Sequence, residues 1–297
     1  MDSRQLDDLL ALLDAKSLTE AAAHRHVTQP AFSRRVRAIE QTLGFEIIDR
    51  SKRPGELKRF VTERHGDIRT LALALSRLTE DLKSASSTDR LLTLSAVHAI
   101  SVSELPRAIR KIEQTLPFTT VRLRSGNLDA CYAMLMTGQA AIMICYETER
   151  RKTRSDEELV ERIVLKKERL VPAISQGRAQ EIRSRLRQNR DVPLVTYPQD
   201  AFLAKVLADM PSDHGARFSL RAISSLSPAI LEMALCGLGV GWVTESQAAH
   251  LFETGQLSLL SDILPGAEMQ MVMLRARSSR SPFLEAGWEV LKTSLGS

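Results

Sequence analysis

The chain has 297 residues, 43% of them hydrophobic and 26% charged, with a formal net charge of +5. This length favours two or three domains, and the composition is that of an ordinary soluble protein. Three scattered cysteines argue against a disulfide framework or a zinc site, and no apolar run approaches the ~18 residues of a membrane span.

The first ten residues, MDSRQLDDLL, do not have the basic start of a signal peptide. We therefore expect a cytoplasmic protein with no membrane partner, and we expect no metal and no cofactor. Lys and Arg outnumber Asp and Glu between residues 25 and 69, so the cationic excess lies in the N-terminal part. Such an excess favours contact with the phosphates of a nucleic acid.

Residues 17–50 have the pattern of a helix-turn-helix DNA-binding motif. Apolar residues at helical spacing predict a first helix near residues 6–13. Ser17 is placed to cap a second helix, and Thr28 a third, with Pro30 in its first turn.

The third helix is predicted to bury one stripe and expose basic side chains beside it. The stripe, which has helical spacing, consists of Phe32, Val36, Ile39 and Leu43. Gly44 is well placed to end this helix. The basic segment that follows, residues 50–62, has no clear period and is interpreted as a loop or wing.

Residues 67–88 are predicted to form a linker helix that joins two copies of the chain. Apolar residues recur at alternating steps of three and four, which is a heptad pattern. The seam consists of Ile68, Leu71, Leu75, Leu78 and Leu82. The alternative is that these side chains pack on the core of their own chain.

From residue 89 onward, predicted strands and helices alternate. Strands are expected at residues 91–97, 119–125, 140–146, 169–175, 193–197 and 268–276, and helices at 104–116, 128–139 and 282–295. Residues 221–245 are predicted to run strand, helix, Gly-Leu-Gly turn, strand. This alternation predicts an α/β domain with a mostly parallel sheet.

At residues 27–50, VTQPAFSRRVRAIEQTLGFEIIDR, the chain resembles the LysR-type transcriptional regulators. Residues 235–243, LCGLGVGWV, are similar to the family's glycine-rich turn, whereas residues 50–66 are longer than the family's wing. The resemblance implies an all-α winged helix-turn-helix, a coiled-coil linker helix and a two-lobed α/β effector domain like the periplasmic binding proteins. It also implies a homodimer or homotetramer that binds a dyad-related double-stranded DNA site, with RNA polymerase as a further candidate partner.

On this basis the expected domains are residues 1–66 for DNA binding, 67–88 for dimerisation, and 89–297 for effector binding. Within the last, lobe I takes about 89–167 and 268–297, and lobe II about 168–267. Gln29, Ser33 and Arg34 are expected to reach base edges from the start of the third helix. The residues expected to hold phosphates are Thr28, Arg35, Arg37, Arg50, Lys52 and Arg53. The alternative is a solvated basic face.

The expected effector site lies between the lobes, where strands end and helices begin. Its candidate residues are His98, Ala99, Ser101, Arg124, Tyr146, Thr196, Tyr197, Ser224 and Ser225. His98 and Ser101 would offer hydrogen bonds, and Arg124 could neutralise a carboxylate. The alternatives are that Ser101 and Ser225 cap helices and that His98 is a hydrogen-bonded core residue.

Two other functions remain open. The first is a redox-responsive LysR-type regulator, switched by oxidation of methionine or cysteine. The simpler interpretation buries Met269, Met271 and Met273 on one strand face and makes the cysteines small buried hydrophobes. The second is a solute-binding protein. No enzyme is expected, because we find no catalytic motif, and Gly237–Gly241 precedes a strand rather than a helix.

Overall fold

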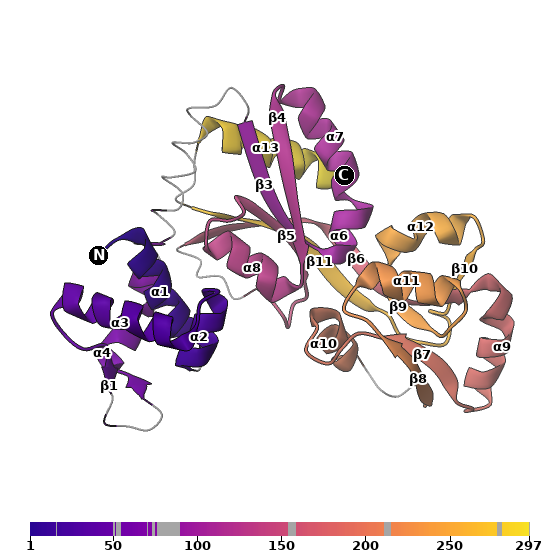
Figure 1. Cartoon of the computed structure of the whole chain (residues 1–297). Coiled ribbons are helices and arrows are strands. Elements are labelled where there is room, and N and C mark those ends of the chain that lie inside the picture. Colours follow the sequence, from indigo (N-terminus) through magenta and orange to yellow (C-terminus); the bar gives the residue numbers. More distant parts are fainter. Residues whose placement is uncertain are drawn as a thin grey trace. The chain divides into compact units, whose positions relative to one another are not determined.

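The structure is a computed structural model that describes residues 1–15, 17–49, 51, 55–69, 71–72, 75, 90–153, 159–210, 215–277 and 281–296. The chain divides into two units (Figure 1). The N-terminal unit comprises Met1–Ser86 together with Met136–Gly138, and the C-terminal unit comprises Ser87–Leu135 and Gln139–Ser297. Among the described residues, no helix has the length and apolar character needed to cross a membrane.

The N-terminal unit is a three-helix motif followed by a short antiparallel strand pair. Its elements are α1 (Ser3–Asp14), α2 (Leu18–His24), α3 (Gln29–Leu43), β1 (Ile48–Asp49), β2 (Glu56–Leu57) and α4 (Arg59–Thr62). The predicted stripe of α3 is confirmed, because Phe32, Val36 and Ile39 are buried and Leu43 packs against them. Strands β1 and β2 pair Ile48 with Leu57, which forms the base of the wing.

Local signals set the ends of these helices. The Ser17 hydroxyl accepts a hydrogen bond of 3.1 Å from the Glu20 amide at the start of α2. Gly44 ends α3 in the left-handed conformation, with φ of 78°, which glycine adopts without steric cost. Thr28 precedes α3 as predicted, but its side chain makes no capping hydrogen bond.

Two buried carboxylates organise the helical motif. Asp8 of α1 is 1% exposed and pairs with Arg25 at 2.7 Å and Arg35 at 3.6 Å. Glu40 of α3 accepts hydrogen bonds from the amides of Ile47 at 2.9 Å and Ile48 at 3.3 Å. Glu40 therefore fixes how the chain turns from α3 into β1.

The predicted dimer seam is described only in part. Residues 65–69, 71–72 and 75 are helical. Ile68 packs against the core of the N-terminal unit, whereas Leu71 is 55% exposed. Leu78 and Leu82 lie outside the described residues.

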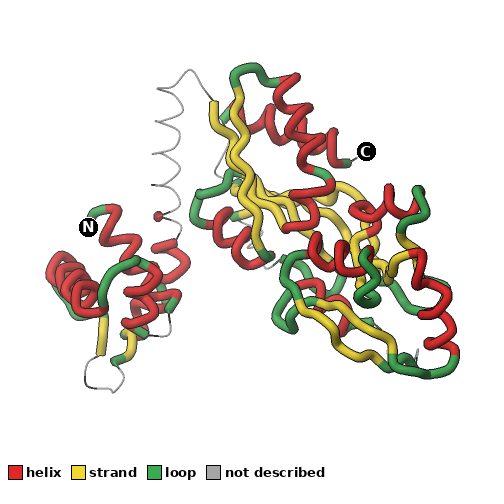
Figure 2. Tube along the Cα trace, turned by 45° about the vertical axis from the view of Figure 1, so that its right-hand side comes forward, coloured by secondary structure: helices red, strands yellow, loops and turns green. Residues whose placement is uncertain are grey.

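The C-terminal unit contains α/β structure throughout. Its elements are β3 (Arg90–Val97), α6 (His98–Ser103), α7 (Leu105–Thr115), β4 (Thr119–Gly126), α8 (Leu128–Met136), β5 (Ile142–Glu147), β6 (Val160–Ser175), α9 (Gln176–Arg187), β7 (Val192–Thr196), α10 (Phe202–Ala208), β8 (Phe218–Ile223), α11 (Ser227–Leu235), β9 (Gly241–Thr244), α12 (Glu245–Glu253), β10 (Leu257–Leu259), β11 (Ala267–Ala276) and α13 (Pro282–Leu295). Figure 2 shows the helices packed around the strands.

The main sheet is mixed, so the expectation of a mostly parallel sheet was wrong. Strand β3 is parallel to β4 and β5, but β11 is antiparallel to both β5 and β6, and β6 is antiparallel to β9 and β10. The reason is that β6 and β11 are long strands that pair across the domain instead of joining successive βαβ units.

Strand β6 belongs to both lobes. It pairs with β11 from Val160 to Leu170, with β9 from Leu170 to Ala173, and with β10 from Ala173 to Ser175. In the second lobe β7 lies parallel to β8, and Leu194 of β7 forms an isolated parallel bridge with Val240, the residue just before β9. One continuous strand therefore connects the two halves of the domain.

The predicted burial of the methionines on β11 is confirmed. Met269, Met271 and Met273 are at most 2% exposed and belong to the main core. Cys131 and Cys145 are also buried, but Cys236 is exposed, which corrects that expectation. Cys236 follows the last turn of α11, beyond the residues that this helix buries.

We predict that Glu40→Ala destabilises the N-terminal unit by about 2–4 kcal/mol, because it leaves two buried amides without an acceptor. Glu40→Gln keeps one acceptor oxygen and should lose less. Urea denaturation followed by circular dichroism measures both variants. Equal stability of Glu40→Ala and the parent chain would contradict the role assigned to this carboxylate.

Candidate DNA-binding and effector-binding sites

The start of α3 presents polar side chains to solvent. Gln29, Pro30, Arg34 and Arg37 are exposed, and Ser33 is half-buried. These residues lie beside the buried stripe, so one side of α3 packs against the core and the other side faces solvent. Hydrogen-bond donors on an exposed helix start have the geometry that a major-groove contact requires.

The residues expected to hold phosphates fall into different surroundings. Thr28 and Arg37 are exposed. Arg35 is half-buried and makes an ion pair with Asp8, which gives it a structural role inside the motif. Arg50, Lys52 and Arg53 lie outside the described residues.

The C-terminal unit contains a small cavity of about 60 Å³ bounded by the ends of strands and the starts of helices. Five of the nine predicted effector residues line it: His98, Ala99, Tyr146, Tyr197 and Ser225. Val97, Gly126 and Asn127, which also line it, fall in the strand ends 96–101 and 124–127 where the sequence places the site. The lining further includes residues that the sequence analysis did not select: Leu128, Ala201, Phe202, Leu203 and Ser227.

The other four candidates lie outside this lining. The Ser101 hydroxyl donates to the Ala96 carbonyl oxygen at 3.3 Å and accepts from Ser125 at 2.6 Å. Arg124 is exposed and donates to Gln139 at 3.3 Å. Thr196 and Ser224 are half-buried nearby.

The structure also corrects the capping alternative for the serines. The residue before α6 is Val97, and Ser101 lies within that helix. The residue before α11 is Leu226, so Ser225 does not cap it. Ser225 is an exposed hydroxyl at the cavity.

Both tyrosines of the cavity use their hydroxyls elsewhere. The Tyr197 hydroxyl donates to the Trp242 carbonyl oxygen at 2.9 Å, and the Tyr146 hydroxyl donates to the buried Glu168 at 3.5 Å. Burial raises the pKa of both phenols, so both remain neutral. They therefore offer a ligand aromatic surface rather than charge.

The polar groups of the cavity come from His98, Ser225 and the helix starts. Partial burial lowers the pKa of His98, which favours its neutral form. Helices α8 and α11 begin at the cavity, and Asn127 accepts a hydrogen bond of 2.8 Å from the Ala130 amide. Because the start of a helix carries the positive end of its dipole and favours negative charge, the cavity suits a small ligand with an apolar part and an acidic group.

The sulfur residues differ in accessibility. Burial raises the pKa of Cys131 to about 11 and that of Cys145 further, which suppresses the reactive thiolate. Met134, Met210 and Met233 are half-buried. Among the described residues, no group of three or more His, Cys, Asp or Glu is arranged to hold a metal ion.

Comparison with family models gives two matches. Residues 85–296 match the LysR substrate binding domain. Residues 3–62 match the bacterial regulatory helix-turn-helix protein, lysR family. The two matches cover both units of the chain.

Individual relatives agree with these matches. The HTH-type transcriptional regulator YjiE of Escherichia coli K12 is 27% identical over 298 residues, covering 98% of this chain and 94% of that protein. The full-length structure of HypT from Salmonella typhimurium, a hypochlorite-specific LysR-type transcriptional regulator, is 26% identical with a TM-score of 0.57 and covers 99% of this chain and 98% of HypT. Vibrio fischeri DarR in complex with DNA shares the fold, with a TM-score of 0.57, 19% identity and coverage of 98% of each chain.

Proposed function

The chain belongs to the LysR family of DNA-binding transcriptional regulators, and on that premise we propose that a small-molecule effector in the C-terminal cavity controls its binding to a dyad-related promoter site. In this proposal residues 1–66 bind DNA, residues 67–88 join two copies, and residues 89–297 bind the effector. Base recognition is supported most directly by the exposed polar residues at the start of α3, a helix whose opposite face is buried in the core of the N-terminal unit.

The effector acts by shifting a balance between two arrangements of the dimer or tetramer. It can do so only if it binds the two arrangements unequally. The small cavity between strand ends supports this, because residues of α6, α8, α10 and α11 line it. Closure around a ligand would move these helices together.

We predict that Arg34→Ala weakens binding to the specific site by about 1–3 kcal/mol and relaxes preference at one base pair. The site is first selected from a random DNA pool with the full chain, and affinity is measured by fluorescence anisotropy. Arg122→Ala, an exposed arginine of the other unit, is the matched control and should bind as the parent does. If Arg34→Ala lowered the affinity for random DNA by the same factor, Arg34 would contact only phosphates.

We predict that Leu71→Asp weakens self-association, because a charge would enter an apolar seam. Leu71 is 55% exposed in the single chain, which supports a partner covering it. Gln180→Asp, at an exposed polar position of the other unit, is the control. An unchanged sedimentation coefficient for Leu71→Asp at micromolar concentration would contradict the seam.

A second candidate, oxidative switching, is favoured by the resemblance to a hypochlorite-specific regulator. The half-buried thioethers of Met134, Met210 and Met233 fit it better than Cys131 and Cys145, because a thioether needs no deprotonation to be oxidised.

One thermal-unfolding experiment on the full chain distinguishes the two candidates. We predict that at least one organic acid of a metabolite panel raises the melting temperature, since a ligand of the folded state stabilises it. His98→Ala should abolish that shift, whereas Met210→Leu should leave it unchanged. A response to hypochlorite alone, lost in the Met210→Leu chain, would replace the effector proposal with the oxidative one.

A further inference from the structure

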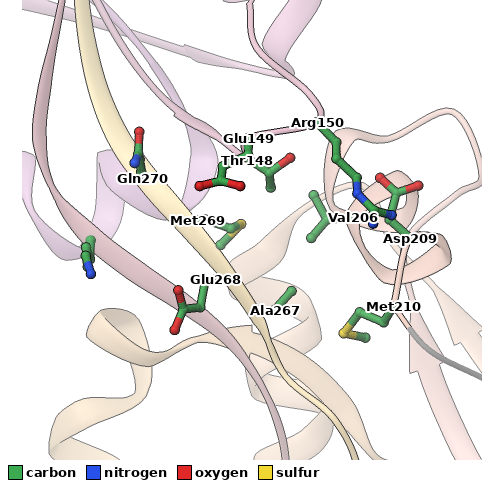
Figure 3. Close-up of a pocket in the computed structure, with 11 residues that line it drawn as sticks. Thr148, Glu149, Arg150, Val206, Asp209, Met210, Ala267, Glu268, Met269 and Gln270 are labelled. Carbon is green, nitrogen blue, oxygen red and sulfur yellow. The ribbon is translucent and has the colours of Figure 1, made fainter.

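A second and larger cavity, of about 340 Å³, lies in the C-terminal unit away from the residues that line the effector cavity. It is bounded by the loop Thr148–Arg150 after β5, the end of α10, and residues 267–270 of β11 (Figure 3). Its volume falls within the range of known small-molecule sites.

The cavity exists because β11 extends further than the neighbouring strand β5. Strand β11 pairs with β6 from Ala267 to Ala276, but with β5 only from Gln270 to Arg275. Beyond Glu147 the chain leaves the sheet, so residues 267–269 have no partner strand on that side among the described residues. The edge of β11 therefore forms one wall.

The cavity has an apolar surface formed by several elements. Val206 and Met210 come from α10 and the residues just after it, and Ala267 and Met269 come from β11. Val206 and Met269 are each 2% exposed, so this surface is anchored in the core.

The positive end of the cavity is built around Asp209. Arg151 donates to both oxygens of Asp209, at 2.5 and 2.7 Å, and lowers the pKa of that carboxyl. Arg150 also acts on Asp209 electrostatically, and Figure 3 shows its side chain extending toward it. Among the described residues at this end, two guanidinium groups thus face one carboxylate, a surplus of one positive charge.

The negative end consists of Glu149 and Glu268, whose exposed carboxylates lie on either side of Met269 in Figure 3. Within the described part of the chain, neither forms an ion pair. Lys167, which pairs in register with Gln270, is the one cation among the lining residues at this end. Among the described residues that line this end, two carboxylates face one ammonium group, a surplus of one negative charge.

We propose that this cavity is a second ligand site that binds a zwitterionic α-amino acid with an aliphatic or thioether side chain. The carboxylate of the ligand would pair with Arg150, its ammonium group with Glu149 and Glu268, and its side chain would cover Val206, Met210 and Met269. A planar guanidinium group recognises a carboxylate through two parallel hydrogen bonds.

The site has a direct connection to the effector cavity through α10. Ala201, Phe202 and Leu203 line the effector cavity at the start of this helix, and Val206, Asp209 and Met210 line the second cavity at its end. A ligand that fixes one end of α10 therefore changes the free energy of binding at the other, and the coupling is reciprocal.

The test is isothermal titration calorimetry of the full chain with L-leucine, followed by the other standard amino acids. Each is used at about 10 mM, because a weak site is filled only when the ligand concentration is well above its dissociation constant. We expect leucine to bind. We expect 3-methylbutylamine and 4-methylpentanoate, which each lack one charge, to bind at least about 10-fold more weakly. Arg150→Ala should weaken leucine binding by a similar factor, and Arg150→Lys should restore part of it.

Variants of the two cavities separate this proposal from the function proposed above. His98→Ala lies in the effector cavity and should leave the leucine affinity unchanged. Loss of leucine binding in His98→Ala but not in Arg150→Ala would place the amino acid in the effector cavity and overturn the second site. The second site is equally overturned if none of the amino acids binds, or if the amine or the carboxylate alone binds as tightly as leucine.

Discussion

The antiparallel pairing of β6 with β11 is the constraint on which the C-terminal unit depends. It runs from Val160 to Leu170 along β6, and the same strand then continues into pairing with β9 and β10. Both lobes are thus built on one uninterrupted backbone. A change in the angle between them must be absorbed in β6 and β11. Between Met271 and Val272 the register shifts because β6 has one extra residue, Leu165, and a strand with such a bulge can bend there.

The N-terminal motif was predictable because its signals are local. Caps, the α3 stripe and Gly44 each act within a few residues, so spacing alone locates the helices. The mixed sheet was not predictable, because the β6–β11 pairing joins segments about a hundred residues apart, and alternation within a strand does not indicate the direction of its neighbour. The first half of β6, residues 160–168, was missed because charged residues, such as Glu161, Arg162 and Lys166, interrupt its apolar run.

The candidate sites follow the same division. Polar residues at strand ends, such as His98 and Ser225, could be selected from sequence because a polar side chain directly after a predicted strand indicates a binding site. Phe202 and Leu203 could not, because an apolar residue on a short helix has the same pattern whether it lines a cavity or a core. The second cavity left no sequence signal at all, since it arises where β5 ends before β11 does.

The exposure of Cys236 has a practical consequence. Of the three cysteines in the chain, the other two are buried, and burial raises their pKa. A maleimide dye at neutral pH should therefore label residue 236 selectively in the folded protein. Because Cys236 ends the helix whose Ser227 lines the effector cavity, the native chain has a built-in attachment point for an optical sensor of whatever that cavity binds.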